Sequence, residues 1–244
     1  MSMMLSRMTL TLALLALLVS TSQAQSAKMQ GNWSVKGTNP AGEAYEGQLK
    51  IKPINVPLYQ LTWDVKYENR DKRQTFPGTA LIDQKSDKMY AAYGINTLRY
   101  GLISYPLNEE DGLEGSATWT SHNGVGAELL GGEFGGDKIA GTYQVVGRRS
   151  PSDVDQGAAE TYDGTLIIRE PKDGRYKLEW YLGDGMPYEG FAYKTDKALI
   201  GVWGIGGSYG LEIYELADNR KSAEAKWYTP IFKDRPGTEQ IRKQ

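Results

Sequence analysis

The segment Gly31-Asn32-Trp33-Ser34-Val35-Lys36-Gly37 returns 110 residues later as Gly141-Thr142-Tyr143-Gln144-Val145-Val146-Gly147. Both terminal glycines, the central aromatic residue and the valine are kept. Further blocks recur in the same order, including Tyr45 to Ile51 as Tyr162 to Ile168, and Gly126-Ala127-Glu128 as Gly237-Thr238-Glu239. So many collinear matches indicate that the chain is a tandem duplication.

Within each copy, apolar residues fall at every second position. Tyr59, Leu61 and Trp63 alternate with polar residues, and Tyr176, Leu178 and Trp180 repeat the pattern. This period is typical of half-buried antiparallel strands. About eight strands are expected in the first copy, over 31–37, 45–52, 58–66, 76–83, 88–95, 98–105, 114–121 and 125–130. Short strands joined by tight turns predict a meander that closes into a barrel and so removes its exposed edges.

The first 24 residues have the features of a secretory signal peptide. Arg7 precedes an apolar run from Leu10 to Val19, and Ser22-Gln23-Ala24 offers small residues for cleavage before Gln25. The run is too short to span a bilayer. Export to a periplasm or to the outside of the cell is therefore expected, without stable membrane insertion.

The duplication predicts an all-β protein with two tandem antiparallel meander domains of about eight strands each. The expected division is a signal at 1–24, a first barrel repeat at 25–130, a glycine-rich linker at 131–137 and a second barrel repeat at 138–244. Glycine-rich segments suit a flexible linker or a tight turn. An alternative therefore stays open, in which these glycines form a turn inside a sheet shared by both copies.

The opening Gly31-Asn32-Trp33 resembles the Gly-x-Trp motif of calycin barrels, the lipocalin and avidin type, and Gly141-Thr142-Tyr143 is a relaxed copy. This resemblance implies a small barrel in which a basic residue near the end of the barrel packs on the opening aromatic ring. Arg242 is a candidate for that partner in the second copy. The repeat also resembles tandem-repeat exported bacterial proteins of unassigned function that carry Gly-x-Tyr-x-Val-x-Gly followed by Tyr-x-Gly-x-Leu-x-Ile.

Composition excludes several kinds of chemistry. The chain has no cysteine and a single histidine, His122, so it has no disulfides, no thiolate and no multi-histidine metal site. It has 28 basic and 30 acidic residues, scattered along the sequence, which gives no electrostatic footprint for nucleic acid. We expect no cofactor and no metal.

Three local patterns have plain structural interpretations. His122 lies in a Ser-His-Asn-Gly hairpin turn that the second copy lacks. The segment 153–157 resembles a calcium loop, but a glycine, Gly164, stands where a bidentate glutamate is needed, so an acidic loop is favoured. The glycine-rich 201–207 is not followed by a helix that would bind phosphate.

The recurring carboxylates and aromatic residues are the candidates for a binding site. A glutamate that faces a barrel interior could hold a ligand, although the same residue could cap backbone groups or point outward. Aromatic residues at alternate strand positions are usually core, but at an open mouth they would form an apolar pocket. The candidate ligand-binding residues are Trp63, Tyr100, Trp119, Glu128, Trp180, Trp203, Tyr209, Trp227 and Glu239.

The leading functional hypothesis is an exported, non-catalytic binding or structural protein whose partner is a small apolar ligand. A second hypothesis is a surface adhesin or envelope-interaction module with an extracellular protein partner, because only the second copy carries the insertion from Arg148 to Thr161. A third is an enzyme that uses Glu128 or Glu239.

Overall fold

The structure, a computed structural model, describes residues 29–244 apart from 56, 84–85, 123, 133–137, 156 and 233–234. The expected signal at 1–24 and most of the expected linker at 131–137 therefore lie outside the described residues.

The described part of the chain is all-β, as the alternating pattern predicted, and its helix α2 is short. The first copy forms β1 (Gly31–Thr38), β2 (Ala44–Asn55), β3 (Leu58–Tyr67), β4 (Gln74–Asp83), β5 (Lys88–Gly94), β6 (Tyr100–Pro106), β7 (Ser116–Ser121) and β8 (Gly124–Gly131). The second copy forms β9 (Gly141–Arg148), α2 (Pro151–Asp155), β10 (Thr161–Lys172), β11 (Arg175–Leu182), β12 (Pro187–Lys194), β13 (Ala198–Gly204), β14 (Tyr209–Leu216), β15 (Ser222–Tyr228) and β16 (Gly237–Lys243).

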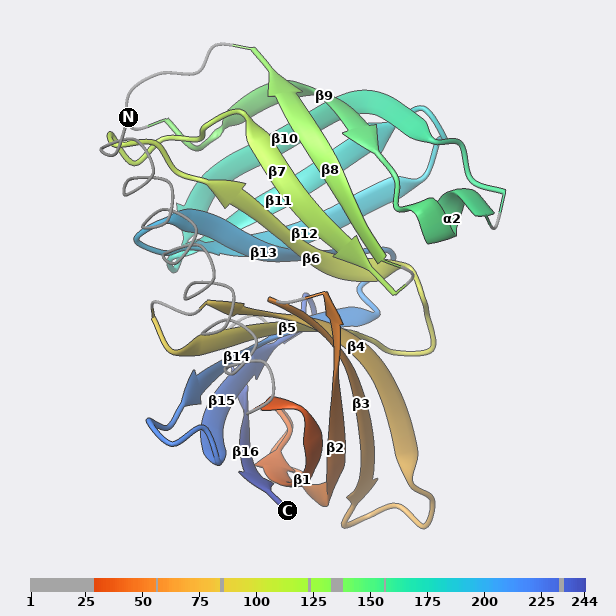
Figure 1. Ribbon diagram of the computed structural model, residues 1–244, viewed down its shortest axis with the longest axis vertical. Helices are drawn as coiled ribbons and strands as arrows, with labels where there is room; N and C mark the ends of the chain where they lie inside the picture. The colour runs from red at the N-terminus through yellow and green to blue at the C-terminus, as the bar shows by residue number, and fades with distance from the viewer. Residues whose placement is uncertain are drawn as a thin grey trace, which may run out of the picture.

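The sixteen strands close into two antiparallel barrels of eight strands each (Figure 1). The first barrel consists of β1 to β5 and β14 to β16, with β5 paired to β14 and β1 paired to β16. The second barrel consists of β6 to β13 and closes where β13 pairs with β6. The second barrel is thus a continuous meander inserted between two strands of the first.

Neither barrel coincides with one sequence repeat, so the expected division at 131–137 differs from the structure. Gly131 ends β8, and β8 pairs directly with β9, so the glycine-rich segment joins two neighbouring strands of the second barrel. The chain passes between barrels at 95–99 and 205–208 instead. Relative to the repeats, each barrel has five strands from one copy and three from the other.

A third apolar cluster joins the two barrels. It includes Tyr90 on β5, Leu102 on β6, Val202 on β13 and Leu211 on β14, all buried. In Figure 1, β5 of the lower barrel lies beneath β6 and β13 of the upper one. These four strands therefore bury both faces, one towards their own barrel interior and one towards the other barrel. Burial of each large apolar side chain there contributes about 1.5–3 kcal/mol.

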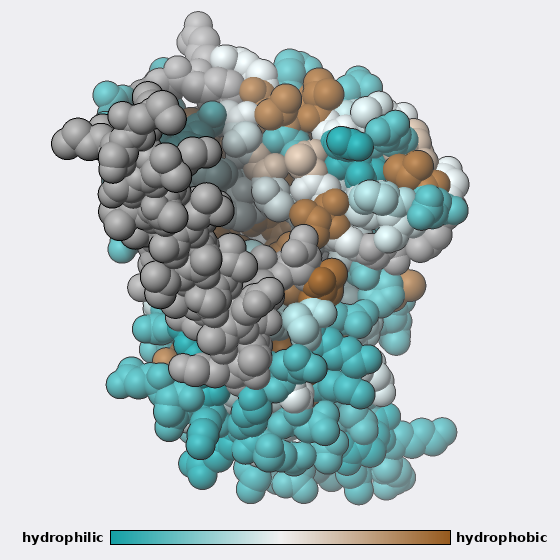
Figure 2. Space-filling view, in the orientation of Figure 1, coloured by the Kyte–Doolittle hydropathy of each residue, from teal (hydrophilic) through white to brown (hydrophobic). Residues whose placement is uncertain are grey.

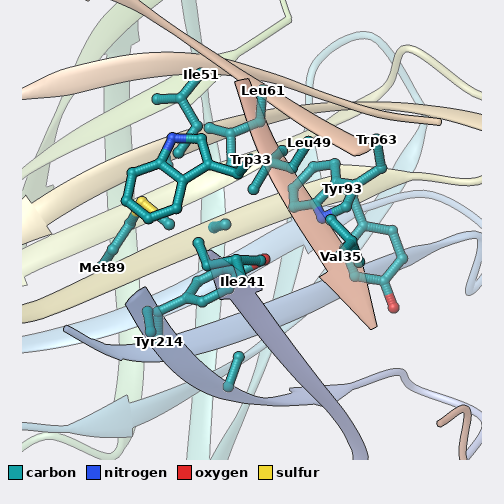
Figure 3. Packing of buried hydrophobic residues seen from close by; sticks show 14 of the residues in the cluster. Trp33, Val35, Leu49, Ile51, Leu61, Trp63, Met89, Tyr93, Tyr214 and Ile241 are labelled. Carbon is teal, nitrogen blue, oxygen red and sulfur yellow. The ribbon is translucent and has the colours of Figure 1, made fainter. Parts of the chain in front are cut away.

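One end of each barrel interior is filled. In the first barrel, the indole Nε1 of Trp33 donates to the Met29 carbonyl at 3.1 Å, and both residues are fully buried. In the second barrel, the Tyr143 hydroxyl donates to the Ile139 carbonyl at 2.9 Å. Figure 3 shows Trp33 and Met89 at this filled end of the first barrel, and Trp63 with Tyr93 at the other end.

The basic partner of the opening tryptophan comes from the last strand of the second copy. The Lys243 ammonium lies 5.8 Å from the Trp33 ring centroid, whereas Arg242, the candidate for the corresponding role in the second copy, is exposed. Side chains on a strand alternate between faces, so only one of these neighbours reaches Trp33. The contact joins the two copies because β16 closes the first barrel.

The conserved spacing of the repeated motif has a packing reason. A Cβ placed on Gly37 would lie 2.3 Å from the Tyr45 ring, and one on Gly147 would lie 1.8 Å from the Tyr162 ring. The second glycine of each Gly-x-Trp/Tyr-x-Val-x-Gly block therefore leaves space for the ring of the tyrosine that begins the following block.

Paired cysteines test the exchange of strands between the repeats. Ser34 and Arg242 are register partners on β1 and β16, so the Ser34→Cys/Arg242→Cys variant should form a disulfide under mild oxidation. The chain has no other thiol to compete. Non-reducing gel mobility and peptide mass mapping measure the cross-link.

The matched control pairs Ser34→Cys with Gly131→Cys, the β8 position equivalent to Arg242. That pair would be adjacent if the first repeat closed on itself. Efficient cross-linking of the control pair, with none in the first pair, would contradict the observed strand order.

Candidate functional site

A buried glutamate in the first barrel accepts hydrogen bonds from three aromatic side chains. Glu239 on β16 is 3% exposed. It accepts from the hydroxyl of Tyr45 at 2.9 Å and from the Trp63 Nε1 at 3.2 Å. The Tyr214 hydroxyl donates to it as well.

The second barrel repeats this arrangement at the equivalent positions. Glu128 on β8 is 2% exposed. It accepts from the Tyr105 and Tyr162 hydroxyls at 2.7 Å and 3.0 Å, and from the Trp180 Nε1 at 3.4 Å. In each barrel, two of the four residues come from one repeat and two from the other. We call each set of four a glutamate clamp.

Burial raises the pKa of both glutamates, because an apolar interior disfavours a charged carboxylate. The pKa of Glu239 rises to about 7, and the three donors oppose part of this rise. Burial likewise raises the pKa of the Glu128 carboxyl, against its own three donors. The tyrosine hydroxyls of both clamps have raised pKa values for the same reason, so they stay protonated and act as donors.

Beside the first clamp lies a cavity of about 70 Å³. It contains a second acid, Glu212 on β14, which is 3% exposed. Burial, and then the neighbouring Glu239 charge, hold the pKa of Glu212 well above its ordinary value. The lining residues are Tyr45, Trp63, Val65, Tyr67, Phe76, Tyr93, Ile95, Glu212, Trp227 and Glu239.

The second barrel has a much larger cavity, of about 730 Å³. Its aromatic walls are in mutual contact, with the Trp119 and Trp203 ring centroids 5.9 Å apart and Tyr188 against Trp203 at 5.9 Å. The lining residues are Leu98, Arg99, Ile103, Trp119, Ser121, Glu128, Arg149, Asp153, Ala158, Ala159, Tyr162, Trp180, Leu182, Asp184, Met186, Tyr188 and Trp203.

The insertion that only the second copy carries contributes to this cavity. Asp153 of α2 accepts from the hydroxyls of Ser150 at 2.6 Å and Ser121 at 3.2 Å, which ties the insertion to the end of β7. Arg149 lies 5.1 Å from the Tyr162 ring centroid and 3.7 Å from the Asp184 carboxylate. Its Nε is buried without a hydrogen-bond partner among the described residues.

Seven of the nine candidate residues line a cavity. Trp63, Trp227 and Glu239 line the first cavity, and Trp119, Glu128, Trp180 and Trp203 line the second. Tyr100 and Tyr209 do not line either one, because they lie in the apolar cluster between the barrels. Both glutamates face a barrel interior.

The other sequence patterns have structural roles. His122 lies in the turn between β7 and β8. The acidic segment 153–157 contains the end of α2, and the described residues hold no cluster of three side chains suited to a metal ion. Within the same residues, no helix has the length and apolar character needed to cross a bilayer.

Sequence reasoning missed several residues of the sites. The tyrosines of the clamps were not among the candidates, although Tyr45 and Tyr162 stand at equivalent places in a repeated block. Tyr105 and Tyr214 recur in the same way. Glu212 had no such signal, because the equivalent residue of the first copy is Ile103.

Comparisons with known proteins add little to this description. No protein-family model matches the chain, and no curated protein matches it in sequence. One solved structure, of a redesigned beta barrel, mFAP1, bound to DFHBI, has 12% sequence identity and a TM-score of 0.25. That match covers 73% of this chain and 96% of the other. Both barrels are defined by their own strand pairing.

The raised pKa values of the two acids in the first cavity predict how the free energy of unfolding depends on pH. A carboxyl whose pKa is higher in the folded state than in the unfolded state binds its proton more tightly when folded, so its stabilising effect is lost as pH rises through the folded value. We expect the free energy of unfolding to fall by about 1–3 kcal/mol between about pH 5 and about pH 8. Urea denaturation at both pH values measures this change in the free energy of unfolding.

The Glu212→Gln/Glu239→Gln variant should lose most of this decline, because neither amide titrates. Glu224→Gln, an exposed change on β15, serves as the control and should retain it. A double variant with the same decline as the control would contradict the raised pKa values.

Proposed function

We propose that the chain is an exported, non-catalytic binding protein whose second barrel holds a small, largely apolar ligand. The observation that supports this most is the cavity of about 730 Å³ in that barrel. Small-molecule sites generally measure about 300–1,000 Å³ and combine apolar walls with a few polar groups. Export follows from the signal-like segment at 1–24 and is part of the proposal.

The walls suit a flat, apolar molecule with one polar end. Trp119, Trp203 and Tyr188 offer ring faces and edges in edge-to-face contact. Such side chains supply a large apolar contact area with defined geometry. Arg149 offers a buried donor that lacks a partner, so an anionic or carbonyl group on the ligand would satisfy it. The ligand would then place its apolar body near Glu128 and its polar end near the insertion.

The insertion supports ligand binding over a separate docking role. Arg149, Asp153, Ala158 and Ala159 all line the cavity, so the insertion covers the proposed site. An adhesin would instead use the side chains of this loop that face outward, such as Ser152 and Glu160. Figure 2 shows that polar side chains dominate this face of the first barrel, while apolar ones gather on the second barrel and at the junction.

The glutamate clamp supports a non-catalytic role. The carboxylate of Glu128 already accepts three hydrogen bonds from fixed aromatic donors. A general acid or base must instead exchange its proton with a substrate within hydrogen-bond reach. The clamp therefore fits a structural and positioning role better than proton transfer.

A fluorescent probe tests the proposal. We expect 1-anilinonaphthalene-8-sulfonate to bind folded protein with enhanced emission, because its rings match the aromatic walls and its sulfonate can accept from Arg149. Ala158→Trp should fill the cavity from the insertion and abolish the signal. Arg149→Met should weaken binding roughly tenfold, as expected for loss of a charged hydrogen bond.

Ala41→Trp is the matched control, since it makes the same change in an exposed turn of the first barrel. It should bind the dye like the wild type. Unchanged dye affinity in both Ala158→Trp and Arg149→Met, with the fold confirmed by circular dichroism, would place the binding elsewhere and reject the proposal.

A further inference from the structure

The cavity of the first barrel contains two buried acids and no basic side chain. Glu212 and Glu239 both line it, and the described lining residues include no Lys, Arg or His. A buried carboxylate without a cationic partner is costly. In the second barrel, Ile103 occupies the position equivalent to Glu212, so Glu128 has no second acid at that position. Burial of Glu212 therefore carries an unfavourable desolvation free energy that has no counterpart at the equivalent position of the second barrel.

Two polar groups at this cavity lack hydrogen-bond partners among the described residues. One is the Oε1 atom of Glu212, and the other is the hydroxyl of Tyr93, which is 9% exposed. Buried polar groups in native proteins are nearly always paired with protein, water or ligand. Glu239 accepts three bonds from its clamp, and a carboxylate has about four acceptor positions, so one is left.

Aromatic rings surround these acceptors. Tyr93 contacts Trp63 at 6.1 Å, Phe76 at 6.4 Å and Trp227 at 6.0 Å between ring centroids, all edge to face. Aromatic faces beside a desolvated cation contribute about 2 kcal/mol or more. Rings combined with carboxylates are therefore suited to an organic cation.

We propose that the first barrel binds the head group of a primary alkylammonium ion between Glu212, Glu239 and Tyr93. The three N–H donors of such a head group match the three open acceptors. The alkyl chain would leave the cavity past Phe76 and Ile95. A metal ion is a poorer match, because calcium needs six to eight oxygen ligands and the described residues hold no cluster of three metal-ligating side chains.

The cavity size agrees with a head group rather than a whole large ligand. Its volume of about 70 Å³ exceeds the ~10–15 Å³ that one water molecule requires on this measure. This site lies in the other barrel from the proposed ligand cavity, so its failure and the failure of the proposed function are separately measurable.

Isothermal titration of the intact protein with n-butylammonium at about pH 8 tests the inference. The titratable groups that line the cavity are Tyr45, Tyr67, Tyr93, Glu212 and Glu239, with Tyr214 against Glu239. Because burial raises the pKa of both carboxyls, binding of the cation should strengthen as pH rises. We expect binding with a Kd on the order of 1 mM or tighter. The neutral 1-butanol and the quaternary tetramethylammonium should each bind at least ~10-fold more weakly, because one lacks charge and the other lacks N–H donors.

Glu212→Ile, which copies the residue of the second barrel, should abolish binding and raise the melting temperature. Glu212→Gln keeps the shape and should weaken binding at least ~10-fold, which covers the case in which the isoleucine disturbs packing. Glu215→Gln, an exposed change on the same strand, should bind like the wild type. No binding by the wild type, equal binding of 1-butanol or tetramethylammonium, or unchanged binding in folded Glu212→Gln would each overturn the inference.

Discussion

The hydrogen bonds from aromatic donors to a buried glutamate connect the two sequence repeats inside each barrel. Glu239 and Tyr214 come from the second copy and meet Tyr45 and Trp63 of the first. Removing one donor would leave a buried acceptor unsatisfied, at a cost of about 1–3 kcal/mol. The clamp therefore requires β16 to lie next to β1, and that pairing in turn closes the first barrel. The glycines of the repeated motif make the room that the clamp tyrosines need.

The sequence predicted the strands well and their partners badly, for a physical reason. Alternation and turn residues placed each strand of the first copy within a few residues of its observed bounds. The same signals cannot decide which strands pair. The strands β6 and β14 carry the same Tyr-Gly-Leu pattern, so either could lie beside β5. Tyr93 can lie over Gly210, as observed, or over its equivalent Gly101, with the same local chemistry. One sequence signal was missed. The strands β5 and β13 are apolar on both faces and are buried almost throughout, so the face that does not line their own barrel must pack against the other barrel.

The functional candidates show the same limit of a duplicated sequence. Recurrence identified Glu128 and Glu239, because both copies need the same clamp. Recurrence could not identify Glu212 or Arg149, which break the symmetry between the copies and give each cavity its own chemistry. The first barrel has a small, acidic, aromatic cavity, and the second has a large one with arginines at its lining. Tyr100 and Tyr209 also recur in the sequence, but the reason is that both pack between the barrels, so their recurrence does not mark a ligand site.

Each barrel is closed by strands of both repeats. A direct test inserts a protease site between Gly132 and Lys138, cuts the folded protein there and measures its native mass. Because the cut falls between β8 and β9 of one barrel, the two halves should stay together as one particle and separate only in denaturant. Two separate folded particles, each with the mass of one repeat, would contradict the exchange of strands between the repeats.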